Sequence, residues 1–263
     1  MHAAAPADLI LCRVDDRGAA GHVAYVTVNN PQKRNTLGIP GKRAIADTFN
    51  QLAKDDRLRV AVITGAGDKS FIAGADIAEM KDLDAGQALT EHTLTHMANK
   101  SIRMLPVPVI ARINGWCLGF GMELAAACDM RIGVNTAKFG MPEVRVGIPS
   151  GMEANLLPAL IGWGKTAELV FTGDIIDADE AYRCGFLQKL VPAAEFGGAV
   201  EKMVASILLG GPRAIRLQKP LLRDWERMSI AEGIQQGIRA CVAARDTDEP
   251  RRMMEAFIAR KRE

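Results

Sequence analysis

The stretch that decides the fold is residues 107–149, VPVIARINGWCLGFGMELAAACDMRIGVNTAKFGMPEVRVGIP. Its part MELAAACDM follows a glycine-rich turn and is almost entirely apolar, which is typical of a helix packed on every side. Glu123 lies in the first turn of that helix, and Glu143 follows Pro142 at a second turn that leads into apolar residues. We therefore expect both carboxyl groups to be largely desolvated. Burial raises a carboxyl pKa, and a second carboxylate nearby raises one of the pair further.

Each glutamate also has a purely structural explanation, because a carboxylate in the first turn of a helix is stabilised by the helix dipole. The neighbouring residues favour a functional role. The segment GWCLGFG at 115–121 places backbone N–H groups at a helix N-terminus just before Glu123, where they stabilise negative charge. The segment FIAGADIAEM at 71–80 has the same layout, with Asp76 as the expected N-cap.

Both segments belong to a repeated pattern of strand, turn, short strand, glycine and helix. The first copy starts with the apolar strand RVAVITG at 59–65, and the second starts with VIARI at 109–113. A third copy is predicted over DMRIGV, NTAKFGM and PEV at 129–144. Self-similarity of this kind indicates a stacked or spiral architecture of the α/β class. It also predicts that two helix N-termini converge on one site.

The composition narrows the class of protein. A chain of 263 residues that is 48% hydrophobic can bury a sizeable core. The net charge of +2 is too balanced to suggest nucleic acid as the main partner. The five cysteines show no C-x-x-C spacing, which argues against a disulfide framework or a zinc site and favours a reducing compartment. No apolar run approaches the roughly 20 residues of a membrane span, and no basic leader opens the chain. We therefore expect a cytoplasmic protein without a membrane partner.

The two ends of the chain have different patterns. Residues 8–14 and 22–29 predict a hairpin of two strands. After Pro192 the pattern is purely helical, so we expect a core domain over 1–197 and a helical region over 198–263. In that region Ser229 and Glu232 cap a helix with one apolar stripe, made of Ile230, Ile234, Ile238, Cys241 and Val242. Such a stripe must pack on the core domain or on another subunit.

Two histidines raise the question of a metal site. His92 and His96 are four residues apart on a helix predicted over 81–105, a spacing that allows two side chains to share a metal ion. No third ligand of a suitable type is near them in the sequence. We therefore expect both histidines to face solvent, and we predict no metal site.

Four motifs occur along the chain in a fixed order: FIAGADIAEM, NGWCLGFGMELAAACD, FGMPEVRVGIPSG and FTGDIIDADEAYRCGFLQKLVP. With the helical tail, the chain resembles the enoyl-CoA hydratase/isomerase (crotonase) family over roughly residues 20–262. The resemblance implies a crotonase-like spiral of β-β-α units with a C-terminal α-helical trimerisation region. It also implies a homotrimer, often paired into a hexamer, and an acyl-CoA thioester substrate. No cofactor is implied beyond the coenzyme A that enters with the substrate.

The resemblance implies a role for each matching residue. The backbone N–H groups of Ala75 and Phe120 would form an oxyanion hole for the thioester oxygen. Glu123 would deprotonate the attacking water, and Glu143 would supply a proton to the substrate. The substrate-binding residues that it implies are Lys33 and Arg34, which border the nucleotide end of coenzyme A, together with Ala73, Asp76, Ile77, Gly119 and Gly121.

These roles predict an enoyl-CoA hydratase, which adds water reversibly and with syn geometry to a 2-enoyl-CoA thioester to give 3-hydroxyacyl-CoA. The pair of glutamates favours this activity over the alternatives within the family, an isomerase or another acyl-CoA lyase or dehydratase, since isomerases generally keep one equivalent acid. A serine peptidase of similar fold would need a paired Ser and His, and no G-x-S-x-G motif is present. A non-catalytic RNA-binding relative would need aromatic platforms, whereas aromatic residues are only 5% of the chain.

Two positions depart from the family pattern. Phe120 stands where the family usually has glycine, so a bulky side chain must be housed there and a positive φ would be strained. The glycine-rich continuation after the second glutamate is replaced by PSGMEANLL at 149–157. Both departures favour an acyl pocket that accepts an unusual substrate.

Overall fold

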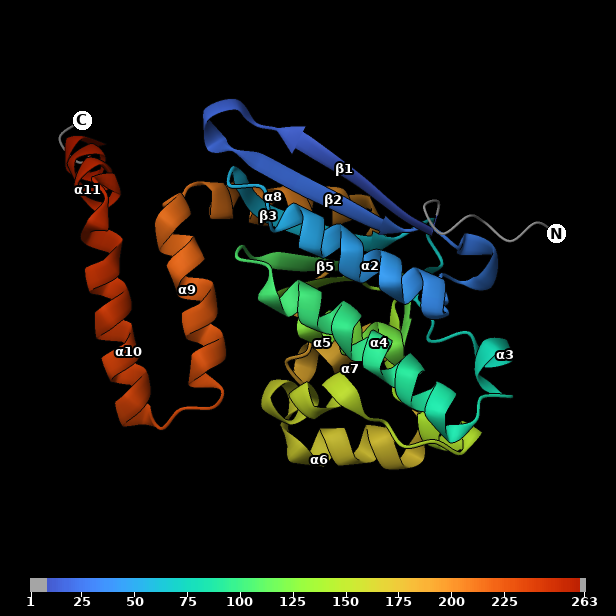
Figure 1. The fold of residues 1–263 in the computed structure, drawn as a ribbon. Helices are drawn as coiled ribbons and strands as arrows, with labels where there is room; N and C mark the ends of the chain where they lie inside the picture. The colour runs from blue at the N-terminus through green and yellow to red at the C-terminus, as the bar shows by residue number, and fades with distance from the viewer. Residues whose placement is uncertain (1–8, 261–263) are drawn as a thin grey trace.

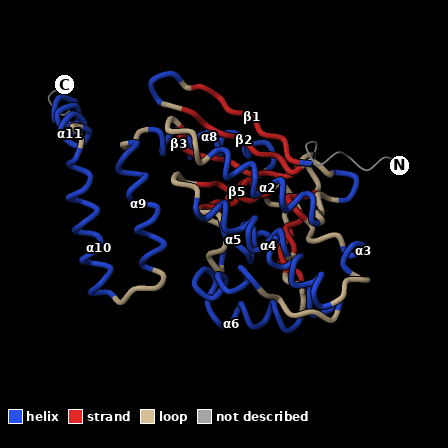
Figure 2. Tube along the Cα trace, viewed as in Figure 1, coloured by secondary structure: helices blue, strands red, loops and turns tan. Residues whose placement is uncertain are grey.

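Two β-sheets carry the fold, and the computed structural model describes residues 9–260 of the chain (Figures 1 and 2). The six-stranded sheet has the order β1-β2-β3-β5-β7-β10, and the four-stranded sheet has the order β4-β6-β8-β9. The first comprises β1 (Ile10–Asp16), β2 (His22–Val28), β3 (Leu58–Gly65), β5 (Val109–Ile113), β7 (Met130–Val134) and β10 (Lys189–Val191). The second comprises β4 (Ser70–Ile72), β6 (Trp116–Leu118), β8 (Lys138–Gly140) and β9 (Ile175–Asp177). The start of the chain, on which the expectation about a leader rests, lies outside the described residues.

The hairpin and the buried strands follow their sequence patterns. β1 and β2 pair antiparallel with Ile10 opposite Val28, which confirms the expected hairpin. From β2 onward the strands of the large sheet run parallel. β3 is buried along almost its whole length, as a nearly continuous apolar run in a parallel sheet requires.

The β-β-α repeat is visible in the sheet order. The long strands β3, β5 and β7 are neighbours in one sheet, and the short strands β4, β6 and β8 that follow them are neighbours in the other. The first two units end in the helices α3 (Ile77–Met80) and α5 (Phe120–Ala127). The third unit ends in a short 3₁₀ helix, η3 (Pro142–Val146), instead of an α-helix. This stacking confirms the predicted spiral of the α/β class.

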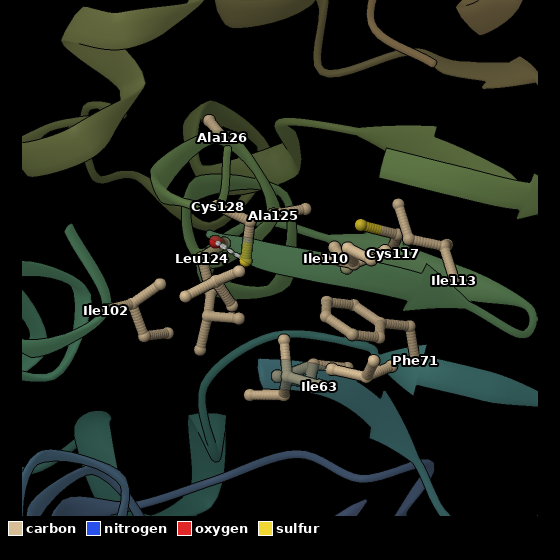
Figure 3. Packing of buried hydrophobic residues seen from close by; sticks show 14 of the residues in the cluster. Ile63, Phe71, Ile102, Ile110, Ile113, Cys117, Leu124, Ala125, Ala126 and Cys128 are labelled. Carbon is tan, nitrogen blue, oxygen red and sulfur yellow. Dashed lines mark hydrogen bonds between the residues drawn. The ribbon is translucent and has the colours of Figure 1, made fainter. Parts of the chain in front are cut away.

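The helix α5 runs through the centre of the core. All eight of its residues are buried, including Glu123. Figure 3 shows Leu124 of this helix among apolar side chains from β3, α4 and β5, including Ile63, Ile102 and Ile110. The helices α2 (Ile39–Leu52) and α4 (Ala85–Met104) pack against each other beside it (Figure 1). A helix this apolar can therefore hold a carboxyl group away from water.

The remaining α-helices, together with the 3₁₀ helix η4, follow Gly151. They are η4 (Met152–Leu156), α6 (Leu157–Thr172), α7 (Ala178–Arg183), α8 (Phe196–Leu208), α9 (Pro212–Trp225), α10 (Ile230–Ala243) and α11 (Glu249–Arg260). The boundary expected after residue 197 falls inside α8, whose Phe196, Val200 and Val204 are buried in the core. The division into two domains stays a prediction. Within residues 9–260, no helix combines the length and apolar character needed to cross a membrane.

The three last helices leave an apolar face open. Figure 1 shows α9 and α10 beside the body, with α11 at the end of the chain. Lys219 of α9 joins this region to the body through an ion pair of 2.8 Å with Asp129. The predicted capping box of Ser229 and Glu232 starts α10. The body does not cover the stripe of α10, because the exposed fractions of Ile230, Ile234, Ile238 and Val242 are 85%, 58%, 53% and 64%.

Close packing between α5 and β4 generates a stability prediction. A Cβ atom at Gly121 would lie 2.0 Å from the Ile72 backbone oxygen, so the Gly121→Ala variant must push the helix away from the strand. We expect it to lower the free energy of unfolding by about 2 kcal/mol or more, in the range of overpacked cores. The matched control is Gly164→Ala in α6, where a Cβ meets nothing within 4 Å and helix propensity improves. Chemical denaturation of both variants measures the difference. Equal stability of the two variants would contradict this account.

Candidate active site

Two segments that follow neighbouring parallel strands place backbone N–H groups side by side. β4 pairs with β6, and each strand leads through a glycine with positive φ, Gly74 or Gly119, into a helix. Among the described residues, the N–H groups of Ala75 and Phe120 donate no hydrogen bond. Their neighbours do, because Ala73 N–H donates to Arg34 at 3.1 Å and Gly119 N–H donates to Gly140 at 2.9 Å. The two uncommitted donors line the same cavity and are available to an oxyanion.

The departure at Phe120 is accommodated without backbone strain. The positive φ of 52° falls on Gly119, and Phe120 takes the first position of α5 instead. Its side chain is 4% exposed and lies against the Lys42 ammonium, which is 5.0 Å from the ring centroid. The expected conflict between a bulky residue and a left-handed conformation therefore does not arise.

Glu123 is held in α5 with almost no access to water. Its exposed fraction is 2%, and its Oε2 atom has no hydrogen-bond partner among the described residues. Desolvation, followed by the negative charges of Glu143 and Glu153, raises the pKa of Glu123 to about 8. The backbone N–H of Ala154 and the charge of Lys42 oppose that shift. A pKa of about 8 keeps this carboxyl group mostly protonated near neutral pH.

Glu143 reaches the same cavity from η3. Its Oε1 atom lies 2.5 Å from the point that a Cβ of residue 119 would occupy, so a side chain at that position would displace the carboxyl group. Its Oε2 atom accepts a hydrogen bond of 2.8 Å from the Ser150 hydroxyl. Overall the pKa of Glu143 is raised, because burial disfavours its ionised form. Hydrogen bonds from its own backbone N–H and from Ser150 favour the ionised form and limit that rise. The two carboxyl groups therefore have different environments, since Ser150 serves only one of them.

The cavity has a volume of about 520 Å³, which is in the range of small-molecule sites. It is lined from α2, α4, α5, η3 and the segments around α3 and η4. The side chains and backbone groups on its wall include Lys42, Ala73, Ala75, Ile77, Met80, Glu91, His92, Thr95, Gly119, Phe120, Glu123, Glu143, Val146, Ile148 and Met152. Both predicted catalytic glutamates and both predicted oxyanion donors are thus brought together.

The predicted substrate-binding residues divide into two groups. Ala73, Ile77 and Gly119 lie on the cavity wall, whereas Lys33, Arg34, Asp76 and Gly121 do not. Lys33 forms an ion pair of 2.7 Å with Asp76, and Arg34 lines a separate pocket of about 300 Å³ together with Lys69. Gly121 provides the close contact with β4 described above.

Each of the two histidines lies against a glutamate side chain. His96 Nδ1 lies 2.7 Å from Glu153 Oε1, and His92 Nδ1 lies 2.8 Å from Glu91 Oε2. The side chains remain 52% and 39% exposed. Across the described part of the chain, no group of three metal-ligating side chains is present.

Sequence analysis missed three buried ionic residues near the site: Lys42, Glu91 and Glu153. A signal existed for two of them. Lys42 falls on the buried stripe of α2, three residues before Ile45, and Glu91 falls on the buried stripe of α4 with Thr95. The buried position of Glu153 had no comparable signal, because η4 is irregular.

Comparison with known proteins places this geometry in a family. The sequence pattern of the enoyl-CoA hydratase/isomerase family matches residues 18–263. The chain is 36% identical to a crotonyl-CoA hydratase of Syntrophomonas wolfei over 91% of this chain and 93% of that protein. It is 33% identical to a short-chain-enoyl-CoA hydratase of Clostridium acetobutylicum over 92% of this chain and 93% of that protein.

A solved structure shares the fold as well. The enoyl-CoA hydratase from Bacillus anthracis superimposes with a TM-score of 0.89 at 31% identity, over 95% of this chain and 96% of that chain. The sequence match, the relatives and the shared fold agree over nearly the whole length. The chain therefore belongs to the enoyl-CoA hydratase/isomerase family.

Proposed function

We propose that this protein is an enoyl-CoA hydratase, which adds water reversibly and with syn geometry to the double bond of a 2-enoyl-CoA thioester to give 3-hydroxyacyl-CoA. One observation carries the proposal. The buried carboxyl group of Glu123 and the half-buried one of Glu143 line the same cavity as the uncommitted N–H groups of Ala75 and Phe120. The hydratase names of the relatives from Syntrophomonas wolfei and Clostridium acetobutylicum support the same reaction.

The two N–H groups stabilise the charge that develops on the thioester oxygen. Attack of water at C3 pushes electrons through the double bond, so the oxygen takes on enolate character. Hydrogen bonds from Ala75 and Phe120 strengthen as that charge grows. A donor of this kind contributes about 2.7–4 kcal/mol to transition-state stabilisation in other enzymes.

The two glutamates move the protons. In hydration, ionised Glu123 takes a proton from the water that attacks C3, and protonated Glu143 gives a proton to C2. Of the two groups Glu123 holds the proton, because no described residue donates a hydrogen bond to its Oε2, whereas Glu143 accepts one from Ser150. That distribution suits dehydration directly, in which Glu123 protonates the leaving hydroxyl group and Glu143 removes the C2 proton. Hydration begins after the proton shifts between the two groups.

The same proposal covers the substrate and the place of action. The substrate is an acyl-CoA thioester, and coenzyme A enters as part of it. The reaction needs no resident cofactor, because the two glutamates transfer the protons and the two backbone N–H groups stabilise the developing charge. Arg34 and Lys33 border the nucleotide end of coenzyme A. We place the enzyme in the cytoplasm.

The apolar stripe of α10 supports an oligomer. Ile230, Ile234, Ile238 and Val242 are all more than half exposed and lie on one helix face. Exposed contiguous apolar surface of this kind marks an interface with another chain. We propose a homotrimer, or two trimers paired into a hexamer, with this face at a contact between copies.

Replacing either catalytic glutamate tests the reaction. Glu123→Gln and Glu143→Gln should each lower kcat for hydration of crotonyl-CoA by at least about 100-fold, since each removes a proton-transfer group. The loss of the conjugated thioester absorbance measures the rate. The matched control is Glu168→Gln, whose carboxylate lies outside the cavity and pairs with Lys165. Wild-type activity combined with undiminished rates in both site variants would refute the mechanism.

Charge placed on the α10 stripe tests the assembly. The double variant Ile234→Glu/Ile238→Glu should dissociate to a single chain, because burying two carboxylates at the contact is unfavourable. Light scattering after size exclusion gives the mass, which we expect to be three or six chains for the wild type. The control Gln235→Glu/Arg239→Glu puts the same groups on exposed positions of the same helix and should keep the assembly. A wild type that runs as one chain would rule the proposal out.

A further inference from the structure

A buried polar cluster forms the part of the cavity wall between α2 and α4. It consists of Lys42, Glu91, His92 and Thr95, and all four side chains line the cavity that holds the proposed catalytic glutamates. The side chains of Lys42 and Glu91 are only 1% and 4% exposed. The proposed hydratase mechanism uses none of them.

Most of the bonding capacity of the cluster is already used. The Lys42 ammonium donates to Glu91 Oε1 and, at 2.8 Å, to the Thr95 hydroxyl oxygen. The Thr95 hydroxyl donates to the Glu91 backbone carbonyl at 3.0 Å. These bonds explain how a cation and an anion coexist in the packing between α2 and α4.

Two buried atoms of the cluster, Glu91 Oε2 and His92 Nδ1, form no hydrogen bond with the described residues. They lie 2.8 Å from each other, but without the angles of a hydrogen bond. The ion pair with Lys42 accounts for Glu91 Oε1, whereas Oε2 has only its charge contact with His92 Nδ1 and accepts no hydrogen bond from a described residue. Buried polar atoms are nearly always hydrogen-bonded, so two that are not, on residues that line one cavity, are available to a polar group of a bound substrate.

The cluster lies close to the reacting part of the site. The Lys42 ammonium is 5.0 Å from the centroid of the Phe120 ring, and the N–H of the same Phe120 is a proposed oxyanion donor. Lys42 also acts electrostatically on Glu123. An acyl chain whose thioester oxygen meets the Phe120 N–H therefore shares the cavity with the Lys42 and Glu91 side chains.

The charges of the cluster determine which kind of substrate group can bind there. A carboxylate would be repelled by the free Glu91 oxygen, and an ammonium group would be repelled by Lys42. A hydroxyl group is neutral and is both donor and acceptor. It can donate a hydrogen bond to Glu91 Oε2 and accept one from the Nδ1–H of His92, so one group supplies a partner for both atoms.

We propose that Lys42, Glu91 and His92 form a subsite for a hydroxyl group on the acyl chain, so that the preferred substrates are hydroxylated acyl-CoA thioesters rather than plain alkyl ones. The inference rests on the proposed function only in assigning this cavity to the acyl chain. Glu91 and His92 bind the hydroxyl group, and Lys42 holds Glu91 in place.

Binding of unreactive saturated thioesters tests the subsite without turnover. Three pairs of equal heavy-atom count compare a terminal hydroxyl with a methyl group: ω-hydroxybutanoyl-CoA with pentanoyl-CoA, ω-hydroxypentanoyl-CoA with hexanoyl-CoA, and ω-hydroxyhexanoyl-CoA with heptanoyl-CoA. Calorimetry gives Kd for each. We expect at least one hydroxylated member to bind about tenfold more tightly than its partner or better, as for a hydrogen bond to a charged group.

Variants assign the preference to the cluster. Glu91→Leu alone would strand a buried ammonium, so the test uses Lys42→Met/Glu91→Leu, which removes both charges together. Its Kd ratio should fall to about one, and His92→Leu should reduce the ratio in part. The control Lys165→Met removes a cation that pairs with Glu168 and Glu180 outside the cavity, and it should keep the wild-type ratio.

Two results would overturn the subsite: wild-type Kd ratios near one, or favouring the methyl group, in all three pairs, or a hydroxyl preference that persists in the double variant. Hydration of crotonyl-CoA is measured separately on the same wild-type sample. Absence of hydration would refute the proposed function, while the Kd ratios would still decide the subsite.

Discussion

The exclusion of water from the Glu123 carboxyl group is the constraint on which the rest of the site depends. Burial together with the neighbouring charge of Glu143 raises its pKa to about 8. An ionised carboxyl group in such a place opposes folding, so the surrounding structure must compensate for it. The start of α5, the Ala154 N–H and the charge of Lys42 supply that compensation. Desolvation and the charges of Glu143 and Glu153 outweigh these groups, so the Glu123 carboxyl group stays available as an acid at neutral pH.

The repeated β-β-α unit explains how distant residues meet. Because β4, β6 and β8 are parallel neighbours, the segments that follow them emerge on one edge of the small sheet. Ala75, Phe120 and Glu143 follow these three strands in turn, so one contribution comes from each unit. Glycine at 119 then allows Glu143 to approach the start of α5, since a side chain there would collide with its carboxyl group. The site is thus a consequence of strand order.

Sequence patterns were sufficient for features that depend on local burial. The apolar run around Glu123 and the recurring glycine before each helix predicted the spiral and the two helix starts. Lys42 and Glu91 fall on the buried stripes of α2 and α4, which a local pattern can indicate. Their pairing depends on how α2 packs against α4, which no local pattern encodes. Similarly, Lys33 looks like a free cation, although Asp76 pairs with it across the fold.

The protonation of the glutamate pair can be measured directly. Infrared difference spectra of the wild-type protein, taken through a pH titration, report the carbonyl stretch of a protonated carboxyl group. We predict such a band at neutral pH, lost as the pH rises through about 8 and absent from the Glu123→Gln variant. If every carboxylic-acid band disappears near the ordinary glutamate pKa of about 4.3, Glu123 is not held protonated, and the central claim of a protonated, buried Glu123 is wrong.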